Sequence, residues 1–218
     1  MSPIYKRLCA LVAATVGILP LTGKAQGSLT YQTTQFGQED YVFMPDPHNP
    51  TVAKYGGRIV EYAGFRRVEG PGFYAELWWA PTQDPTLAIY APIPRSKVTF
   101  RSGTTAGLIN GWSKLEIPET YGGDIVLLQL RVWENLNGTI QTWEQALTTS
   151  GIIRGETHPF LHELAGVDRS GNPKLGSGSI AGAVPNFSLA VTIPEPHSVG
   201  WALFGLSLLW IRRPFVAP

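Results

Sequence analysis

The sequence predicts a mainly β protein: an antiparallel β-sandwich, immunoglobulin-like or jelly-roll-like, with one short helix. Gly (24 residues) and Pro (18 residues) are abundant while charged residues make up only 15%, and this composition favours short strands and turns. Segments of alternating apolar and polar residues recur between turn signals at spacings of roughly ten residues, as they do in sandwiches. Only one segment carries a convincing set of helix-capping signals.

The chain is expected to begin with a secretory signal helix over residues 1–25. Lys6 and Arg7 precede an apolar stretch over residues 8–21, which is the layout of an export signal. Small residues before the end of this segment place signal peptidase cleavage after Ala25. The alternative is a buried first helix, which Pro20 would break. Removal of the signal would also remove Cys9, the single cysteine, and with it any thiol chemistry.

Residues 26–57 form a polar, Pro-rich segment, and the predicted β-sandwich domain follows over residues 58–193. The strands expected in this domain are 58–65, 72–81, 97–102, 112–118, 124–134 and 186–193. Residues 158–165 are either an edge strand or a short turn, and residues 169–185 are a Gly/Ser-rich connector. The helix is expected over residues 142–151, with Thr142 and Gln145 forming a capping box and Gly151 at its end.

The strand 124–134 is the strongest of the set. Val126, Leu128, Leu130 and Val132 would form one unbroken apolar face, while the opposite face turns polar halfway along. This pattern is typical of a central strand. In the strand 72–81, the same alternation places Trp79 on one face and Trp78 on the other.

The end of the chain has the layout of a membrane-spanning sorting signal. Pro194, Glu195 and Pro196 stand before an uncharged apolar run over residues 199–211, and Arg212 and Arg213 follow directly. As a helix, this transmembrane run would span roughly 20 Å, short of the ~30 Å hydrocarbon core. A core helix is disfavoured because the run is apolar on all sides. The two arginines would keep the tail cytoplasmic.

This layout resembles the PEP-CTERM sorting signal of exported bacterial proteins, which has a Pro-Glu-Pro motif, a short apolar helix and a basic end. The resemblance implies export by the Sec machinery, transient anchoring in the inner membrane, and recognition by an exosortase that cleaves near the motif. It also implies a Gram-negative bacterium that makes exopolysaccharide. The tail departs from the pattern in having only two arginines and five residues after them.

The middle of the chain carries a second, less specific resemblance. Residues 72–193 are similar to the small sandwich domain that precedes such tails in Verrucomicrobia-type exported proteins. The matching stretches are GPGFYAELWWAP, FRSGTTAGLINGW, LQLRVWE followed by TWEQAL, and NFSLAV. The function of that family is unassigned, so this resemblance implies a sandwich fold and an exported protein but no particular chemistry.

Several function classes are disfavoured by the residues themselves. Without its two ends the chain is slightly acidic, so it has no electrostatic footprint for nucleic acid. His158 and His162 are four residues apart beside Glu163, but Pro159 intervenes and no third ligand is evident, so neither a metal site nor a cofactor is predicted. Nothing in the sequence pairs carboxylates for glycoside hydrolysis; those on or beside predicted elements are Glu76, Glu116, Asp124, Glu134 and Glu144.

Aromatic residues are the stronger lead to a binding function. Trp78, Tyr74 and Trp112 are candidate carbohydrate contacts, because exposed aromatic rings on a sheet stack against sugar rings. The alternative is that these rings pack inside the domain.

The leading hypothesis is therefore an exported, non-enzymatic protein of the cell surface or extracellular matrix, associated with exopolysaccharide. A carbohydrate-binding module is the alternative, and a glycoside hydrolase is a third hypothesis.

Overall fold

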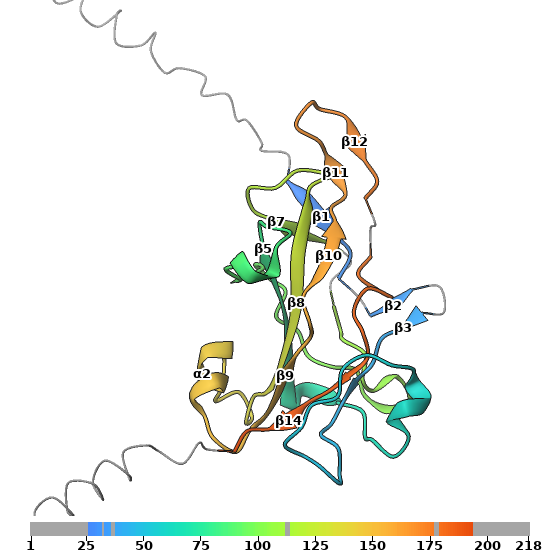
Figure 1. Cartoon of the computed structure of the whole chain (residues 1–218), viewed down its shortest axis with the longest axis vertical. Helices are drawn as coiled ribbons and strands as arrows, with labels where there is room; N and C mark the ends of the chain where they lie inside the picture. The colour runs from blue at the N-terminus through green and yellow to red at the C-terminus, as the bar shows by residue number, and fades with distance from the viewer. Residues whose placement is uncertain (1–25, 32, 36–37, 112–113, 177–178, 194–218) are drawn as a thin grey trace, which may run out of the picture.

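The computed structural model describes residues 26–31, 33–35, 38–111, 114–176 and 179–193 (Figure 1). The predicted signal segment with Ala25 and the predicted sorting tail with Pro194, Glu195, Pro196, Arg212 and Arg213 lie outside the described residues, as does the apolar run 199–211. Among the residues that are described, no helix has the length and apolar character needed to cross a bilayer.

A six-stranded antiparallel sheet forms the centre of the molecule. Its order is β14-β9-β8-β5-β6, and β10 also pairs with β8. The bounds are β5 Phe73–Ala80, β6 Ala91–Pro92, β8 Ile125–Glu134, β9 Ile153–Glu156, β10 Phe160–Glu163 and β14 Ala190–Val191. Strands β5 and β8 pair along the whole of β5, which confirms the two strongest strand predictions.

Four two-stranded pairs lie around this sheet. They are β1 Gly27–Leu29 with β7 Leu115–Ile117, β2 Thr34–Gln35 with β3 Gln38–Glu39, β4 Val42–Phe43 with β13 Phe187–Ser188, and β11 Gly166–Val167 with β12 Pro173–Lys174. Only β4 and β13 run parallel. The described chain is thus mainly β, with antiparallel sheets and one short helix, and its described strands do not assemble a second continuous sheet that would close a sandwich.

The main core lies on the side of the sheet that we call the inner face. Val126, Leu128, Leu130 and Val132 of β8 are all buried there, together with Leu77 of β5. The alternation of the sequence predicts this apolar face, and the structure confirms it.

The N-terminal segment 26–57 contributes to the same core, although its polar composition had suggested a separate region. Leu29, Tyr31 and Val42 belong to the main apolar cluster. Strand β1 pairs with β7, and β4 pairs with β13 near the end of the described chain. A few apolar residues, together with the pairing of β1 and β4, therefore join this largely polar segment to the main domain.

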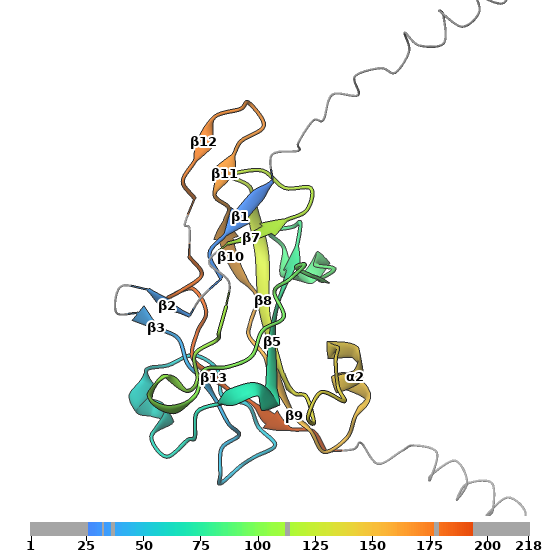
Figure 2. The same ribbon diagram turned by 180° about the vertical axis from the view of Figure 1, so that it is seen from behind.

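The single α-helix of the described residues, α2 (Trp143–Thr148), covers the opposite side of the sheet, which we call the outer face (Figures 1 and 2). The predicted capping box is present, because Thr142 Oγ1 accepts a hydrogen bond from the backbone N–H of Gln145 and the Gln145 side chain accepts one from Thr142. The helix ends at Thr148 instead of Gly151, since the N–H of Thr149 already closes the last turn on the carbonyl of Gln145.

Two strand predictions were wrong. Residues 58–65 contain a 3₁₀ helix, η1 (Ile59–Tyr62), in which the Glu61 carboxylate accepts a hydrogen bond from the N–H of Arg58 at 2.9 Å. The buried Tyr62 ring stacks on Phe43 with centroids 4.3 Å apart, and this contact favours a turn over an extended strand. Residues 97–102 form only isolated bridges, from Val98 and Phe100.

The other short elements refine the remaining predictions. Residues 158–165 contain a strand, β10, and the connector 169–185 contains β12. Three further 3₁₀ helices stand in loops: η2 Gly70–Gly72, η3 Pro85–Leu87 and η4 Gly103–Thr105.

Candidate functional site

The outer face carries polar and aromatic residues in two cross-strand rows. Strand register places Glu76, Arg131 and Glu156 side by side on β5, β8 and β9. The next row contains Tyr74, Trp133 and Arg154. Because directly paired residues point to the same side of a sheet, both rows face helix α2.

Arg131 is the centre of the first row. Its Nε lies 3.0 Å from Gln129 Oε1 and 3.3 Å from Glu156 Oε2. Its guanidinium carbon lies 4.0 Å from the centroid of the Trp78 ring and 5.4 Å from that of Trp143. The side chain is only 14% exposed. Hydrogen bonding, ion pairing and cation–π contacts together offset the cost of burying this charge.

This arrangement corrects the prediction that Trp78 offers an exposed surface to sugars. Trp78 does lie on the outer face, but it is only 7% exposed and Arg131 covers its ring. Its Nε1 donates to Glu76 Oε2 at 2.9 Å. The cover comes from Arg131 of β8 and from a buried cluster that includes Trp143 of α2. Both are distant in sequence from Trp78, so strand alternation alone could not reveal the burial.

Among the described residues, the other aromatic rings of this face give no open sugar-binding surface either. Tyr74 is half-buried, with its ring 5.8 Å from that of Trp133 in an edge contact. Trp133 and Trp143 are buried, and Trp79 packs against the main core. Trp112 lies outside the described residues.

Most of the predicted carboxylates contact a structural partner in the described part of the chain. Glu76 and Glu156 flank Arg131, so a guanidinium stands where a hydrolase would need room for a sugar and a water molecule. Burial raises the pKa of Glu76, while the Trp78 hydrogen bond lowers it. Three of the four other predicted carboxylates contact a lysine, an arginine or backbone amides: Glu116 with Lys114, Asp124 with Arg169 and the Tyr121 N–H, and Glu134 with the Ile153 N–H.

The two histidines, His158 and His162, have different surroundings. His162 is 3% exposed on β10, opposite Val126 on the inner face, and its Nε2 has no hydrogen-bond partner among the residues that the structure describes. Burial lowers its pKa. The His158 ring packs edge-on against Tyr55 at 4.7 Å. The described residues contain no cluster of three or more His, Cys, Asp or Glu side chains placed to hold a metal ion.

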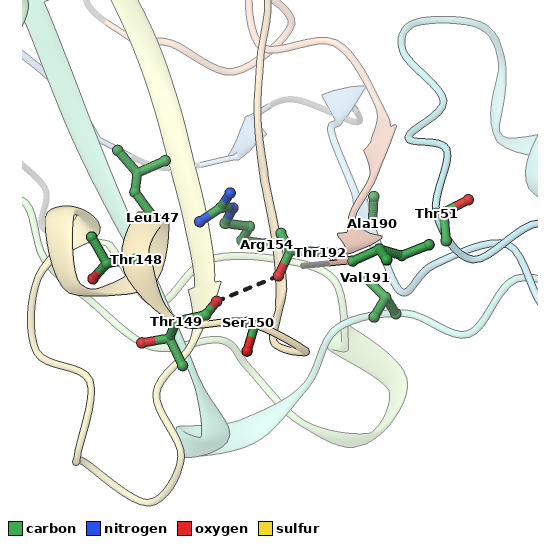
Figure 3. Close-up of a pocket in the computed structure, with 10 residues that line it drawn as sticks. Thr51, Leu147, Thr148, Thr149, Ser150, Arg154, Ala190, Val191 and Thr192 are labelled. Atoms are coloured by element: carbon green, nitrogen blue, oxygen red, sulfur yellow. Dashed lines mark hydrogen bonds between the residues drawn. The ribbon is translucent and has the colours of Figure 1, made fainter. Parts of the chain in front are cut away.

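A pocket of about 680 Å³ lies where the end of α2 approaches β9 and β14 (Figure 3). One side chain in its wall is a cation and none is an acid. Five carry hydroxyl groups. The lining residues are Thr51, Leu147, Thr148, Thr149, Ser150, Arg154, Ala190, Val191, Thr192 and Ile193. Sequence reasoning missed this pocket because its walls come from three segments that are far apart in the chain.

Comparison of the sequence with protein-family models and with curated proteins, and of the fold with solved structures, finds no match in any of the three.

Proposed function

We propose that the chain is an exported, non-enzymatic protein of a bacterial cell envelope or extracellular matrix, sorted by an exosortase through its C-terminal tail. The observation that carries this proposal is the order of signals in the last residues. Pro194, Glu195 and Pro196 precede the apolar run 199–211, and Arg212 and Arg213 close it. A basic, apolar segment at the start of the chain supplies the matching export signal.

The arrangement of the body is consistent with processing at both ends. The first strand begins at Gly27 and the last strand ends at Val191. Cleavage after Ala25 and near Pro194 would therefore leave every described strand intact. These two strands lie near opposite ends of the molecule (Figure 1), so the two cuts would fall at separate places and outside the central antiparallel sheet.

The proposed role of the mature body is structural or adhesive, in association with exopolysaccharide. Carbohydrate binding is a second candidate function, and the pocket beside α2 favours it more than Trp78 does. Hydrolysis has less support, because Arg131 occupies the space between Glu76 and Glu156.

The test is the location of the full chain in a bacterial host that has an exosortase and in the same host without it. We expect the body in the outer envelope and matrix fractions of the first host and retention in the inner membrane of the second. An Arg212→Ala/Arg213→Ala variant should be retained in both hosts. Arg58→Ala/Arg66→Ala, which removes the same charge from exposed positions of the body, should sort normally. Equal distribution of the wild-type chain in both hosts would refute the proposal.

A further inference from the structure

The pocket beside α2 has the size and position of a ligand site. Its volume of about 680 Å³ falls within the ~300–1,000 Å³ that is usual for small-molecule pockets. It opens at the end of the body from which the chain continues toward the Pro-Glu-Pro motif, because Ile193 forms part of its wall.

Arg154 gives the pocket its charge. Register with Trp133 places it on the outer face, and it lines the pocket together with Leu147 of α2 (Figure 3). One of its amino groups donates to the carbonyl of Ala146. In the described part of the chain it makes no ion pair, because the neighbouring Glu156 is paired with Arg131 at 3.3 Å. A guanidinium has five N–H donors, so most of its donors remain for a ligand.

The remaining walls combine hydroxyl groups with apolar edges. Thr192 Oγ1 is oriented by the carbonyl of Ile152 at 3.2 Å, and Thr149 Oγ1 by that of Gln145 at 2.8 Å. Leu147 is 50% exposed and Ile193 is 67% exposed. A ligand that matches these walls carries an anionic group for the guanidinium, several hydroxyl groups, and C–H surface for the apolar edges.

We propose that this pocket binds a carboxylated sugar, a uronic acid unit of an acidic polysaccharide, with its carboxylate on Arg154. A carboxylate pairs with the planar fork of a guanidinium through two parallel hydrogen bonds. The choice of a sugar among carboxylated ligands rests on the proposed function, which places the body in a polysaccharide matrix.

The test is calorimetric titration of the full chain, purified in a mild detergent, with oligogalacturonate. Neutral galacto-oligosaccharide of the same length and sodium sulfate serve as the comparison ligands. We expect oligogalacturonate to bind at least 10-fold more tightly than either. Arg154→Gln should weaken its binding at least 10-fold, while Arg66→Gln, at an exposed arginine of the body, should leave it unchanged.

Arg154→Gln also loses a contact to α2 and could fold poorly for that reason. A second pair of variants therefore tests the pocket without changing Arg154. Thr51 is exposed at the rim of the pocket. Thr51→Glu should weaken oligogalacturonate binding by repulsion, whereas Thr51→Gln, of the same size without the charge, should bind within about 2-fold of the wild type. Thr104→Glu, at an exposed threonine of η4, should bind as the wild type does.

Three results would overturn the inference: equal binding of the neutral sugar, equal binding of sulfate alone, or unchanged binding by Thr51→Glu. None of them depends on sorting, since the titration uses purified chain. A chain that sorts correctly but does not bind uronate refutes only this inference. A chain that binds uronate but is not processed refutes only the proposed sorting.

Discussion

The two faces of strand β8 are both largely buried, but their side chains are covered by different kinds of contact. On the inner face, Val126, Leu128, Leu130 and Val132 pack against other apolar side chains. On the outer face, Gln129 and Trp133 are buried and Arg131 is largely covered, and hydrogen bonds, an ion pair and cation–π contacts hold these residues in place. The inner face depends on shape and apolar area, whereas the outer face depends on specific polar partners.

This difference predicts where the chain is most sensitive to substitution. In an apolar core, each side-chain atom that is removed lowers the free energy of unfolding. In a polar cluster, the main cost of removing one member is that its buried partners lose their hydrogen bonds or ion pairs. The following substitutions separate the two mechanisms, from the largest expected effect to the smallest.

Leu130→Ala tests the inner face. Leu130 is fully buried at the centre of the main core, so its truncation should lower the free energy of unfolding by about 2–5 kcal/mol. Urea denaturation followed by tryptophan fluorescence measures the loss. Leu161→Ala on the neighbouring strand β10, at a side chain that is 54% exposed, should cost less than about 0.5 kcal/mol. Equal losses would contradict the assignment of the core.

Arg131→Ala tests the outer face. It removes the ion pair with Glu156 and uncovers Trp78, and we expect a loss of about 2 kcal/mol, below that of a fully buried pair because Glu156 is partly exposed. Arg131→Met keeps the apolar stem over Trp78 and should lose less. The same urea denaturation experiment measures both variants. A loss for Arg131→Ala that exceeds that of Leu130→Ala would reverse the comparison.

His162→Leu tests the polar exception on the inner face. Burial lowers the pKa of His162 in the folded state, and the nearby Glu163 raises it. Burial is the larger effect, so the pKa of His162 is lower in the folded chain than in the unfolded chain. The folded state is therefore not penalised by His162 titration above the pKa of the unfolded histidine, and it loses stability as the pH falls below that value, because the unfolded chain then binds the proton more readily. The leucine variant should gain about 1 kcal/mol over the wild type at pH 5 and less at pH 8. A gain that does not change with pH would show that His162 does not titrate as described.

Thr142→Ala tests the cover of the outer face. It removes the acceptor of the capping box and should cost about 1 kcal/mol. Hydrogen exchange at the amides of residues 143–148 should speed up, while exchange in β8 stays unchanged. Thr104→Ala, at an exposed loop threonine, is the matched control. Unchanged exchange in α2 would mean that the capping box does not hold the helix.

The elements that could be predicted are those with local signals. Strands β5 and β8 follow from alternation, and α2 follows from the capping pair Thr142 and Gln145. The strand prediction for residues 58–65 was wrong. Their β-branched residues suggest a strand, whereas Glu61 and Tyr62 make contacts that a turn satisfies better. The burial of Trp78 and the pocket around Arg154 depend on segments that are distant in the sequence and are brought together by the fold. No local sequence pattern could therefore predict them.

The intact mass of the mature protein from an exosortase-positive host tests the sorting claim most directly. The account predicts a chain that begins at Gln26, ends close to Pro194–Pro196 and lacks both Arg212 and Arg213. In the same host without exosortase, the chain should begin at Gln26 and keep its C-terminus. A mature product from the exosortase-positive host that still ends at Pro218 would contradict the account.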